Sequence, residues 1–138
     1  MFTGALTVLA IVAGCHEKGP EFAPVKGVVR INGTPERGLL VRFAPDPAKG
    51  NGLPAFARGK TDDQGVYTLK YEYRGEEGAG APVGWQRVAI VDSKVGLTPQ
   101  GQDPKPSAVP LVYGNIATTP LVVEVKSGDN PIDLDVKK

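Results

Sequence analysis

Short runs of alternating apolar and polar residues, separated by turn-forming residues, occupy the chain from Val25 onward. In one such run Leu39, Val41 and Phe43 fall on one side of an extended chain, while Arg42 falls on the other. A period of two residues is typical of strands with one buried face, and no window keeps the 3.6-residue period of a helix. The pattern therefore predicts an all-β domain of the sandwich type.

The alternating runs predict seven strands, and turn signals lie between them. Asn32-Gly33 is a hairpin signal because both residues tolerate a positive φ. Pro35 and Gly38 lengthen the connection that follows, so a tight hairpin and a longer connection both remain open. The segment 62–65 has the Asp and Gly residues of a tight turn, which predicts that the runs 55–61 and 66–73 pair with each other. The predicted strands are 25–31, 39–44, 55–61, 66–73, 84–92, 121–125 and 132–136.

The same alternation predicts the side chains that fill the core between two sheets. They are Val41, Phe43, Leu69, Val88, Ile90, Val123, Val125, Leu134 and Val136. Three connections, 44–54, 74–83 and 93–109, are longer than the ~2 to 5 residues usual in hairpins. Long loops add ordering entropy without adding core, which favours a binding role for at least one of them. Insertions on a spacer domain are the alternative.

The N-terminal segment differs in composition from the rest of the chain. An apolar run precedes Cys15, and Val12-Ala13-Gly14-Cys15 resembles the lipobox of bacterial lipoproteins. The resemblance implies a diacylglycerol group on Cys15 and removal of residues 1–14 as a signal peptide, a run shorter than the ~20 residues of a membrane span. Residues 15–24 then form a flexible tether and 25–138 the domain. A buried N-terminal strand with a free core cysteine is the alternative.

Charge and cysteine content argue against a nucleic-acid-binding protein and against a fold held by internal disulfides. The 16 Lys and Arg residues nearly balance 15 Asp and Glu residues, and no long basic run is present. A net charge of +1 without such a run gives no electrostatic footprint for nucleic acid. One cysteine forms no internal disulfide. The 18 Gly and 13 Pro residues suit a chain of many short strands and turns.

The sequence predicts no catalytic, metal or cofactor site. The single histidine, His16, lies in the predicted tether, so the domain has no imidazole to act as a base or ligand. Glu76-Glu77 is expected at a solvated loop tip, and the Asp62-Asp63 turn has fewer oxygens than the ~6 that calcium needs. Three serines lie in predicted turns without an adjacent base, namely Ser93, Ser107 and Ser127. We expect no enzymatic activity.

Six segments of the predicted domain carry a recognisable pattern, namely 25–29, 32–35, 59–69, 80–84, 110–113 and 118–121. They resemble the transthyretin-like or carboxypeptidase-regulatory-like sandwich domains, especially those of small lipoproteins from planctomycete-type bacteria. The sequence departs from the family pattern at Gln86, beside Trp85, where an inward aromatic residue is common. The resemblance implies a Greek-key β-sandwich of about seven strands in a secreted or surface setting, and it implies no settled activity.

These observations favour a non-catalytic module of the cell envelope, outside the cytoplasm, that is anchored to a membrane by lipid and binds an envelope protein or glycan. Trp85, Tyr73 and Tyr113 are the candidate ligand-binding residues, because apolar sugar faces stack on aromatic rings. Packing in the core or at its edge is the ordinary role of such rings. A carbohydrate-binding module is therefore the alternative function, and an enzyme with an unfamiliar set of residues is a third. The sequence leaves open which membrane holds the lipid.

Overall fold

A computed structural model describes residues 19–95, 101–102 and 105–138 of the chain. Strands dominate these residues, which contain no α-helix and two short 3-10 helices, η1 (Pro47–Lys49) and η2 (Leu111–Gly114). The prediction of an all-β domain is confirmed. The predicted signal peptide, Cys15 and His16 lie outside the described residues.

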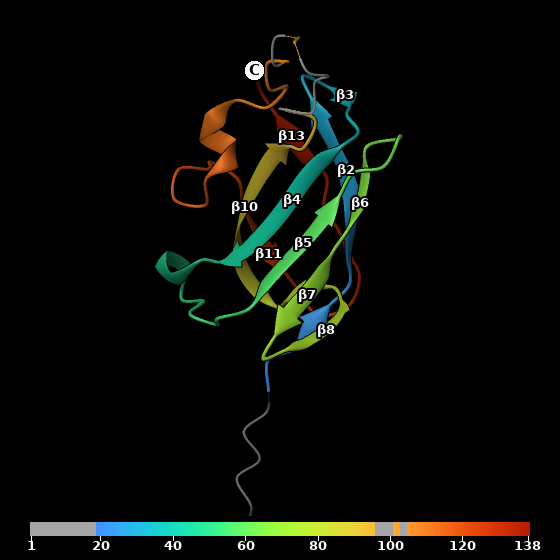
Figure 1. Cartoon of the computed structure of the whole chain (residues 1–138). Coiled ribbons are helices and arrows are strands. Elements are labelled where there is room, and N and C mark those ends of the chain that lie inside the picture. Colours follow the sequence, from blue (N-terminus) through green and yellow to red (C-terminus); the bar gives the residue numbers. More distant parts are fainter. Residues whose placement is uncertain (1–18, 96–100, 103–104) are drawn as a thin grey trace, which may run out of the picture.

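The larger sheet has six strands in the order β11-β10-β4-β5-β7-β8, and every neighbouring pair is antiparallel. In Figure 1 its strands β4, β5 and β7 lie in front of β2. The strands are β4 (Leu39–Pro45), β5 (Phe56–Lys60), β7 (Lys70–Tyr73), β8 (Glu76–Ala79), β10 (Gly84–Asp92) and β11 (Val122–Val125).

The second sheet is built around β2 (Val25–Ile31), the strand with the same bounds as the first predicted strand. On one side of β2 lie β12 (Asn130–Pro131) and β13 (Leu134–Val136), which run parallel to it. On the other side lie β3 (Thr34–Pro35) and β6 (Val66–Thr68), which are antiparallel to it. A small third sheet pairs β1 (Phe22–Ala23) with β9 (Ala81–Pro82).

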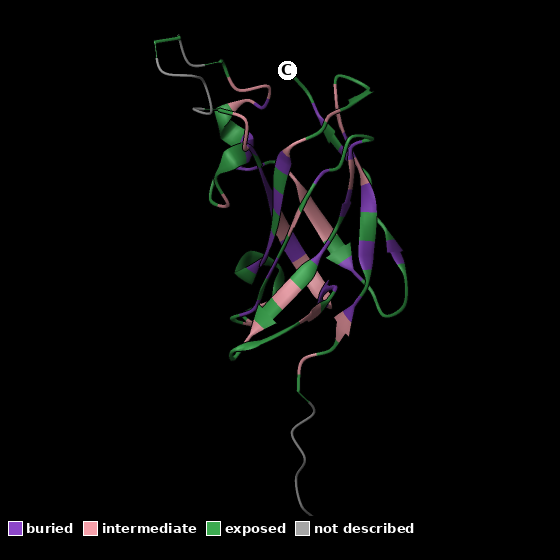
Figure 2. Ribbon diagram, turned by 45° about the vertical axis from the view of Figure 1, so that its right-hand side comes forward, coloured by how far each residue is buried: buried purple, intermediate pink, exposed green. Residues whose placement is uncertain are grey.

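The hydrophobic core lies between the two main sheets and takes one face of each strand. Buried and exposed residues alternate along the strands in Figure 2. Val123 is partly buried and packs against the core, and Gln86 takes a fully buried position in the inward register of β10. The other predicted core residues are buried as expected, namely Val41, Phe43, Leu69, Val88, Ile90, Val125, Leu134 and Val136.

The hairpin predicted between strands 25–31 and 39–44 is wrong, whereas the pairing predicted between 55–61 and 66–73 is confirmed for the second half of the latter run. Asn32-Gly33 forms a tight turn with positive φ values, but it joins β2 to the short β3, whereas β4 pairs with β5 and β10. The predicted strand 66–73 divides at Leu69, so that β6 pairs with β2 and β7 pairs with β5. The alternation of inward and outward residues is uninterrupted from 66 to 73, because the same side of the chain faces the core in both halves. The pattern therefore gives no sign that the two halves belong to different sheets. The described residues contain thirteen strand segments where the pattern predicts seven strands, because this run divides and because short strands such as β1, β3, β8 and β9 form outside the predicted runs.

The predicted loop 74–83 is also wrong, because most of it forms β8 and β9. Arg74 and Gly75 have φ values of 49° and 78° and make a two-residue turn that returns the chain beside β7. Positive φ at both turn positions matches the right-handed twist of the strands, which favours a tight hairpin. Glu76 and Glu77 are consequently exposed on a strand at the sheet edge instead of at a loop tip.

The predicted tether ends earlier than expected. Phe22 and Ala23 form β1, the Ala23 side chain is buried, and the Phe22 ring stacks on Tyr71 with 3.7 Å between ring centroids. Aromatic stacking and burial of apolar surface stabilise this attachment. Strand structure is therefore already present at Phe22, before the predicted start of the domain at Val25.

The C-terminal strand approaches β2 closely at Gly27. A Cβ atom on Gly27 would lie 1.8 Å from the Ile132 carbonyl oxygen, so only glycine fits there. The buried Tyr67 hydroxyl donates a 2.6 Å hydrogen bond to the same oxygen, and burial raises the pKa of this phenol well above its usual value. Gly27 and Tyr67 together fix the C-terminal segment on the second sheet.

Asp133 attaches the C-terminal segment to β2 at an exposed position. Its carboxylate accepts hydrogen bonds from the Val28 N–H (2.9 Å) and the Arg30 guanidinium (3.2 Å), which hold the pKa of Asp133 below its usual value. A lowered pKa means that the folded state favours the charged form. This contribution to stability is therefore present above the pKa of the unfolded chain and is lost as the pH falls through the folded value.

Truncation of an inward and an outward residue on β4 tests this packing. Phe43→Ala removes a fully buried ring, and we expect it to lower the free energy of unfolding by ~3 to 5 kcal/mol because a cavity remains. Leu40→Ala on the exposed face of the same strand is the control, with an expected loss under about 1 kcal/mol. Urea denaturation measures both values. Equal losses would contradict the assigned faces.

Candidate functional site

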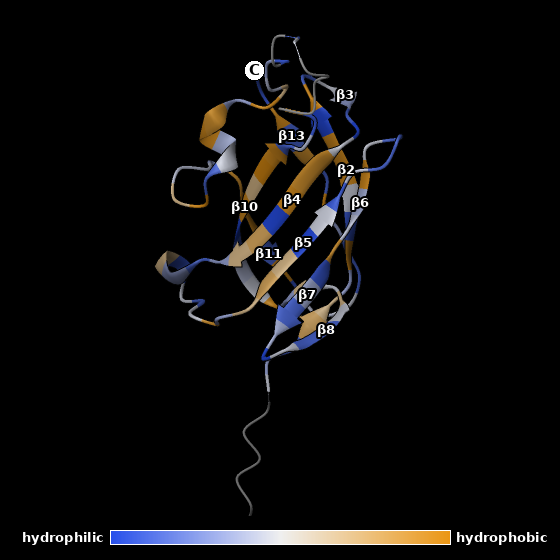
Figure 3. Ribbon diagram, in the orientation of Figure 1, coloured by the Kyte–Doolittle hydropathy of each residue, from blue (hydrophilic) through white to orange (hydrophobic). Residues whose placement is uncertain are grey.

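A prominent hollow of the described surface lies on the outer face of the six-stranded sheet. We call it the outer groove, and its volume is about 710 Å³. Strands β4, β5 and β10 form its floor, and residues 114–116 form one side. Figure 3 shows hydrophobic residues along β4 and β10 and in the segment of η2. The residues that line the groove are Leu40, Val41, Arg42, Ala44, Phe56, Arg58, Gly59, Lys60, Ala89, Val91, Gly114, Asn115 and Ile116.

Large apolar side chains are exposed on this floor. Leu40 is 44% exposed, Phe56 46% and Val91 46%, and Leu40 lies directly opposite Val91 in the β4–β10 pairing. Scattered apolar residues on a surface are common, whereas apolar residues gathered in one hollow indicate a binding surface. The outer groove is such a hollow.

Three cationic side chains lie on neighbouring strands of the outer face, two of them in the groove and the third beside it. The antiparallel register places Arg42 of β4 opposite Arg58 of β5, and Arg58 opposite Lys70 of β7. We call these three residues the cationic row. Directly opposed residues have Cβ atoms about 4.5 to 5.5 Å apart, and like charges at that separation destabilise a sheet. The row is therefore unfavourable for folding by itself.

The partners of the row compensate this repulsion in part. Arg58 forms an ion pair with Glu72 (3.7 Å), and the Arg42 guanidinium stands 4.9 Å from the centroid of the Phe56 ring. Glu72 itself lies opposite Glu77 near the sheet edge. Both carboxylates lie outside the outer groove, whose described lining contains cations and no carboxylate. The charged side chains in the described lining of the groove are consequently all positive.

The side of the groove is held in place by hydrogen bonds to β10. The Thr119 hydroxyl donates to the Val88 carbonyl oxygen (2.6 Å), and the Arg87 guanidinium donates to the carbonyl oxygens of Ile116 and Ala117 (3.3 Å each). Buried Tyr113 accepts a 3.2 Å hydrogen bond from the Lys137 N–H at its hydroxyl oxygen. These contacts keep the η2 segment standing beside the sheet.

Arg87 also fixes the 46–51 loop. Its Nε atom donates to the buried Asp46 carboxylate at 3.2 Å, while Asp46 accepts the Ala48 N–H and so begins η1. Asn51 donates from Nδ2 to the Trp85 carbonyl oxygen. One arginine therefore links this loop, β10 and the side of the groove, which makes it a structural residue.

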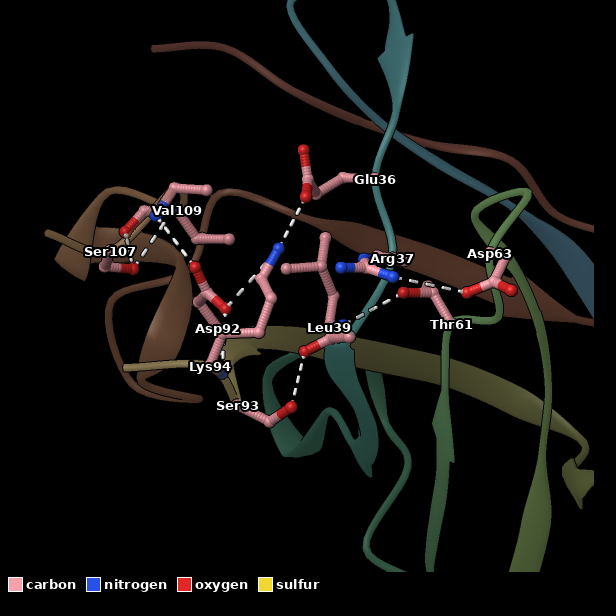
Figure 4. Close-up of polar contacts among 12 residues, drawn as sticks. Glu36, Arg37, Leu39, Thr61, Asp63, Asp92, Ser93, Lys94, Ser107 and Val109 are labelled. Carbon is pink, nitrogen blue, oxygen red and sulfur yellow. Dashed lines mark hydrogen bonds and ion pairs between the residues drawn. The ribbon is translucent and has the colours of Figure 1, made fainter. Parts of the chain in front are cut away.

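A second cluster of polar groups lies where β10 ends (Figure 4). Lys94 stands between Glu36 and the buried Asp92, and Asp92 also accepts hydrogen bonds from the N–H groups of Lys94 and Ala108. Ser107 accepts the Val109 N–H. These contacts attach the chain after β10 to the sheet. The polar atoms satisfy one another, and the cluster offers no pair of nucleophile and base.

The structure does not bring the three predicted aromatic residues together. Trp85 lies half-buried on β10 with the Lys49 ammonium 4.0 Å from its ring centroid, and it faces the outer side. Tyr73 belongs to β7, three strands away at roughly 14 Å, and Tyr113 is buried in η2. Carbohydrate binding by these residues stays a prediction, and the rings form no common platform.

The remaining candidates have local structural contacts. Ser93 donates its hydroxyl to the Gly38 carbonyl oxygen, and the Asp62 carboxylate accepts the N–H groups of Gln64 and Val66 within its own turn. In residues 19–95, 101–102 and 105–138, no group of three His, Cys, Asp or Glu residues is arranged to hold a metal ion. Nor does that part of the chain contain a helix long and apolar enough to cross a membrane.

Sequence reasoning missed the outer groove because it depends on register. Each strand shows a cationic residue on its polar face, which is ordinary for a solvated sheet. Only the pairing of β4 with β5 and of β5 with β7 places Arg42, Arg58 and Lys70 in one row. The sequence did contain one weak indication of an apolar outer surface, because Leu40 and Val91 are apolar at outward-facing positions.

Comparison with known proteins adds no further assignment: no family model, no curated protein and no solved structure matches this chain. A proposal about function therefore has to be argued from the geometry of the structure itself.

Replacing Arg42 tests the repulsion in the cationic row. We expect Arg42→Glu to be more stable than Arg42→Gln by about 0.2 to 1 kcal/mol, because a carboxylate opposite Arg58 turns repulsion into attraction. Both variants lose the contact with Phe56, so the comparison isolates charge. Urea denaturation at low ionic strength measures the difference, which should shrink at about 1 M salt. A stability difference between the two variants that does not change with salt, or that has the opposite sign, would contradict a repulsion between Arg42 and Arg58.

Proposed function

We propose that this protein is a non-catalytic binding module of the cell envelope, held at a membrane by a lipid on Cys15 and exposed outside the cytoplasm. Its fold is proposed to be a Greek-key sandwich of the transthyretin-like or carboxypeptidase-regulatory-like kind. The strand order supports this connectivity: β4, β5 and β7 lie in sequence, and β10 returns to lie beside β4. The Val12-Ala13-Gly14-Cys15 segment supports the anchor.

The observation that carries the binding function is the outer groove. Its volume of about 710 Å³ lies within the ~300 to 1,000 Å³ of small-molecule sites. The lining combines exposed apolar side chains with a few cations, whereas nucleophile and base pairs are absent from the described lining. Such a surface supplies affinity and orientation without supplying a reactive group.

The anchor predicts a defined mass for the mature protein. Membrane-extracted protein should lack residues 1–14 and carry diacylglycerol on Cys15, while Cys15→Ser should leave the chain unlipidated and unprocessed. Intact-mass spectrometry separates the two forms. A mature chain with Met1 and a free thiol on Cys15 would exclude the anchor.

Position-specific crosslinking in native envelopes tests the groove as the binding surface. A photoreactive residue at Val91, on the groove floor, should give a discrete adduct. The matched control is the same residue at Thr68, which is exposed on the second sheet. Adducts only from Thr68, or equal yields from both positions, would place the binding surface elsewhere.

A further inference from the structure

We propose that the ligand of the outer groove is a single amphipathic anion. An alkyl chain or apolar ring would lie on Leu40 and Val91, and a carboxylate or phosphate group would lie between Arg42 and Arg58. This inference rests on the proposed function and adds the chemical class of the ligand.

The charges of the groove select an anion. Arg42, Arg58 and Lys60 line it, and its described lining has no carboxylate. Arg42 and Arg58 are directly opposed, and an anion between them would relieve their repulsion. Guanidinium groups bind carboxylates and phosphates with paired hydrogen bonds, so two opposed arginines suit one such group. In the described chain the Arg42 guanidinium stands over the Phe56 ring and forms no ion pair, so its N–H groups are available to a ligand. Arg58 already has the exposed Glu72 carboxylate at 3.7 Å, with which a ligand anion would share it.

The apolar floor selects a ligand with an apolar part. Leu40 lies between Val91 on one side and Lys60 on the other, so apolar and cationic groups are direct neighbours. A wholly apolar ligand would remove the cations from water without a partner, which is costly. A small hydrophilic anion would leave the apolar floor in water. A ligand with both parts satisfies both surfaces.

The shape of the groove favours one molecule over an extended surface. Gly114, Asn115 and Ile116 rise beside the floor, and they are held there through Arg87 and Thr119. A flat bilayer that contacts the raised side would not reach the floor behind it. The volume of about 710 Å³ is that of a site for a small ligand.

Isothermal titration calorimetry with monomeric amphiphiles tests the proposal on the full chain carrying Cys15→Ser. The probes are octyl phosphate, octyl glucoside and inorganic phosphate. We expect octyl phosphate to bind about tenfold more tightly than either of the other two probes. Octyl glucoside lacks the anionic group, and inorganic phosphate lacks the alkyl chain. Any background binding of an octyl chain to the N-terminal apolar run is common to all variants.

Matched variants then locate the site. Arg42→Gln with Arg58→Gln should weaken binding of octyl phosphate by about tenfold or more and leave octyl glucoside unchanged. Lys26→Gln with Lys126→Gln changes the net charge equally at exposed positions outside the groove and should have no effect. Urea denaturation confirms that each variant is folded.

Each contrary result overturns a defined part of the proposal. Equal affinity for octyl phosphate and octyl glucoside, or an unaffected Arg42/Arg58 variant, excludes the anion. Equal affinity for octyl phosphate and inorganic phosphate excludes the apolar part. Binding to phosphatidylglycerol vesicles without binding of octyl phosphate replaces the single molecule by a membrane surface. Crosslinking from Val91 is independent of these probes, so it still decides whether the groove is a binding surface.

Discussion

The inward packing of β4, β5 and β10 is the constraint on which the rest of the structure depends. Phe43 and Ala57 are buried in the core, and because side chains alternate along a strand, Arg42 and Arg58 must face outward. A slip of one residue in β5 would bury Arg58 and expose Ala57. Packing of the core therefore fixes the register that places Arg42 and Arg58 opposite each other on the outer face. The repulsion between them cannot be relieved by a shift in register.

This coupling gives a physical reason to treat the outer face as functional. Natural sequences generally avoid like charges at directly opposed positions of a sheet, because such pairs reduce stability without improving the core. Here the unfavourable row lies beside an uncovered apolar floor, and the side of the groove is held by Thr119 and Arg87. Binding sites commonly retain local features that reduce stability, since the ligand supplies the missing interaction.

The sequence was sufficient to predict the long strands and their buried faces, whereas it missed short strands such as β1, β8 and β9. Period-two alternation identified the inward residues of β4 and β10, such as Phe43 and Ile90, because burial of apolar surface acts locally on each strand. The split at Leu69 could not be predicted, because the inward face continues unchanged while the strand moves from one sheet to the other. The hairpin at Arg74-Gly75 was missed because arginine is an unusual residue at positive φ.

The candidate site was less predictable than the fold. It depends on which strands are neighbours, and single-sequence patterns carry little information about pairing between distant strands. The aromatic residues chosen from sequence are distributed over different faces, because Tyr113 fills space beneath η2 and Trp85 is contacted by Lys49. Residues with an ordinary outward position, such as Arg42, become informative only when their neighbours across the sheet are known.

Backbone amide chemical shifts during a titration with octyl phosphate test the central claim most directly, because they report the contacted face without altering the protein. The account predicts that the largest changes occur in β4, β5 and β10 and in residues 114–116, with little change in β2, β6 and β13. Changes concentrated in the second sheet, or spread evenly over both sheets, would contradict the outer groove as the functional surface.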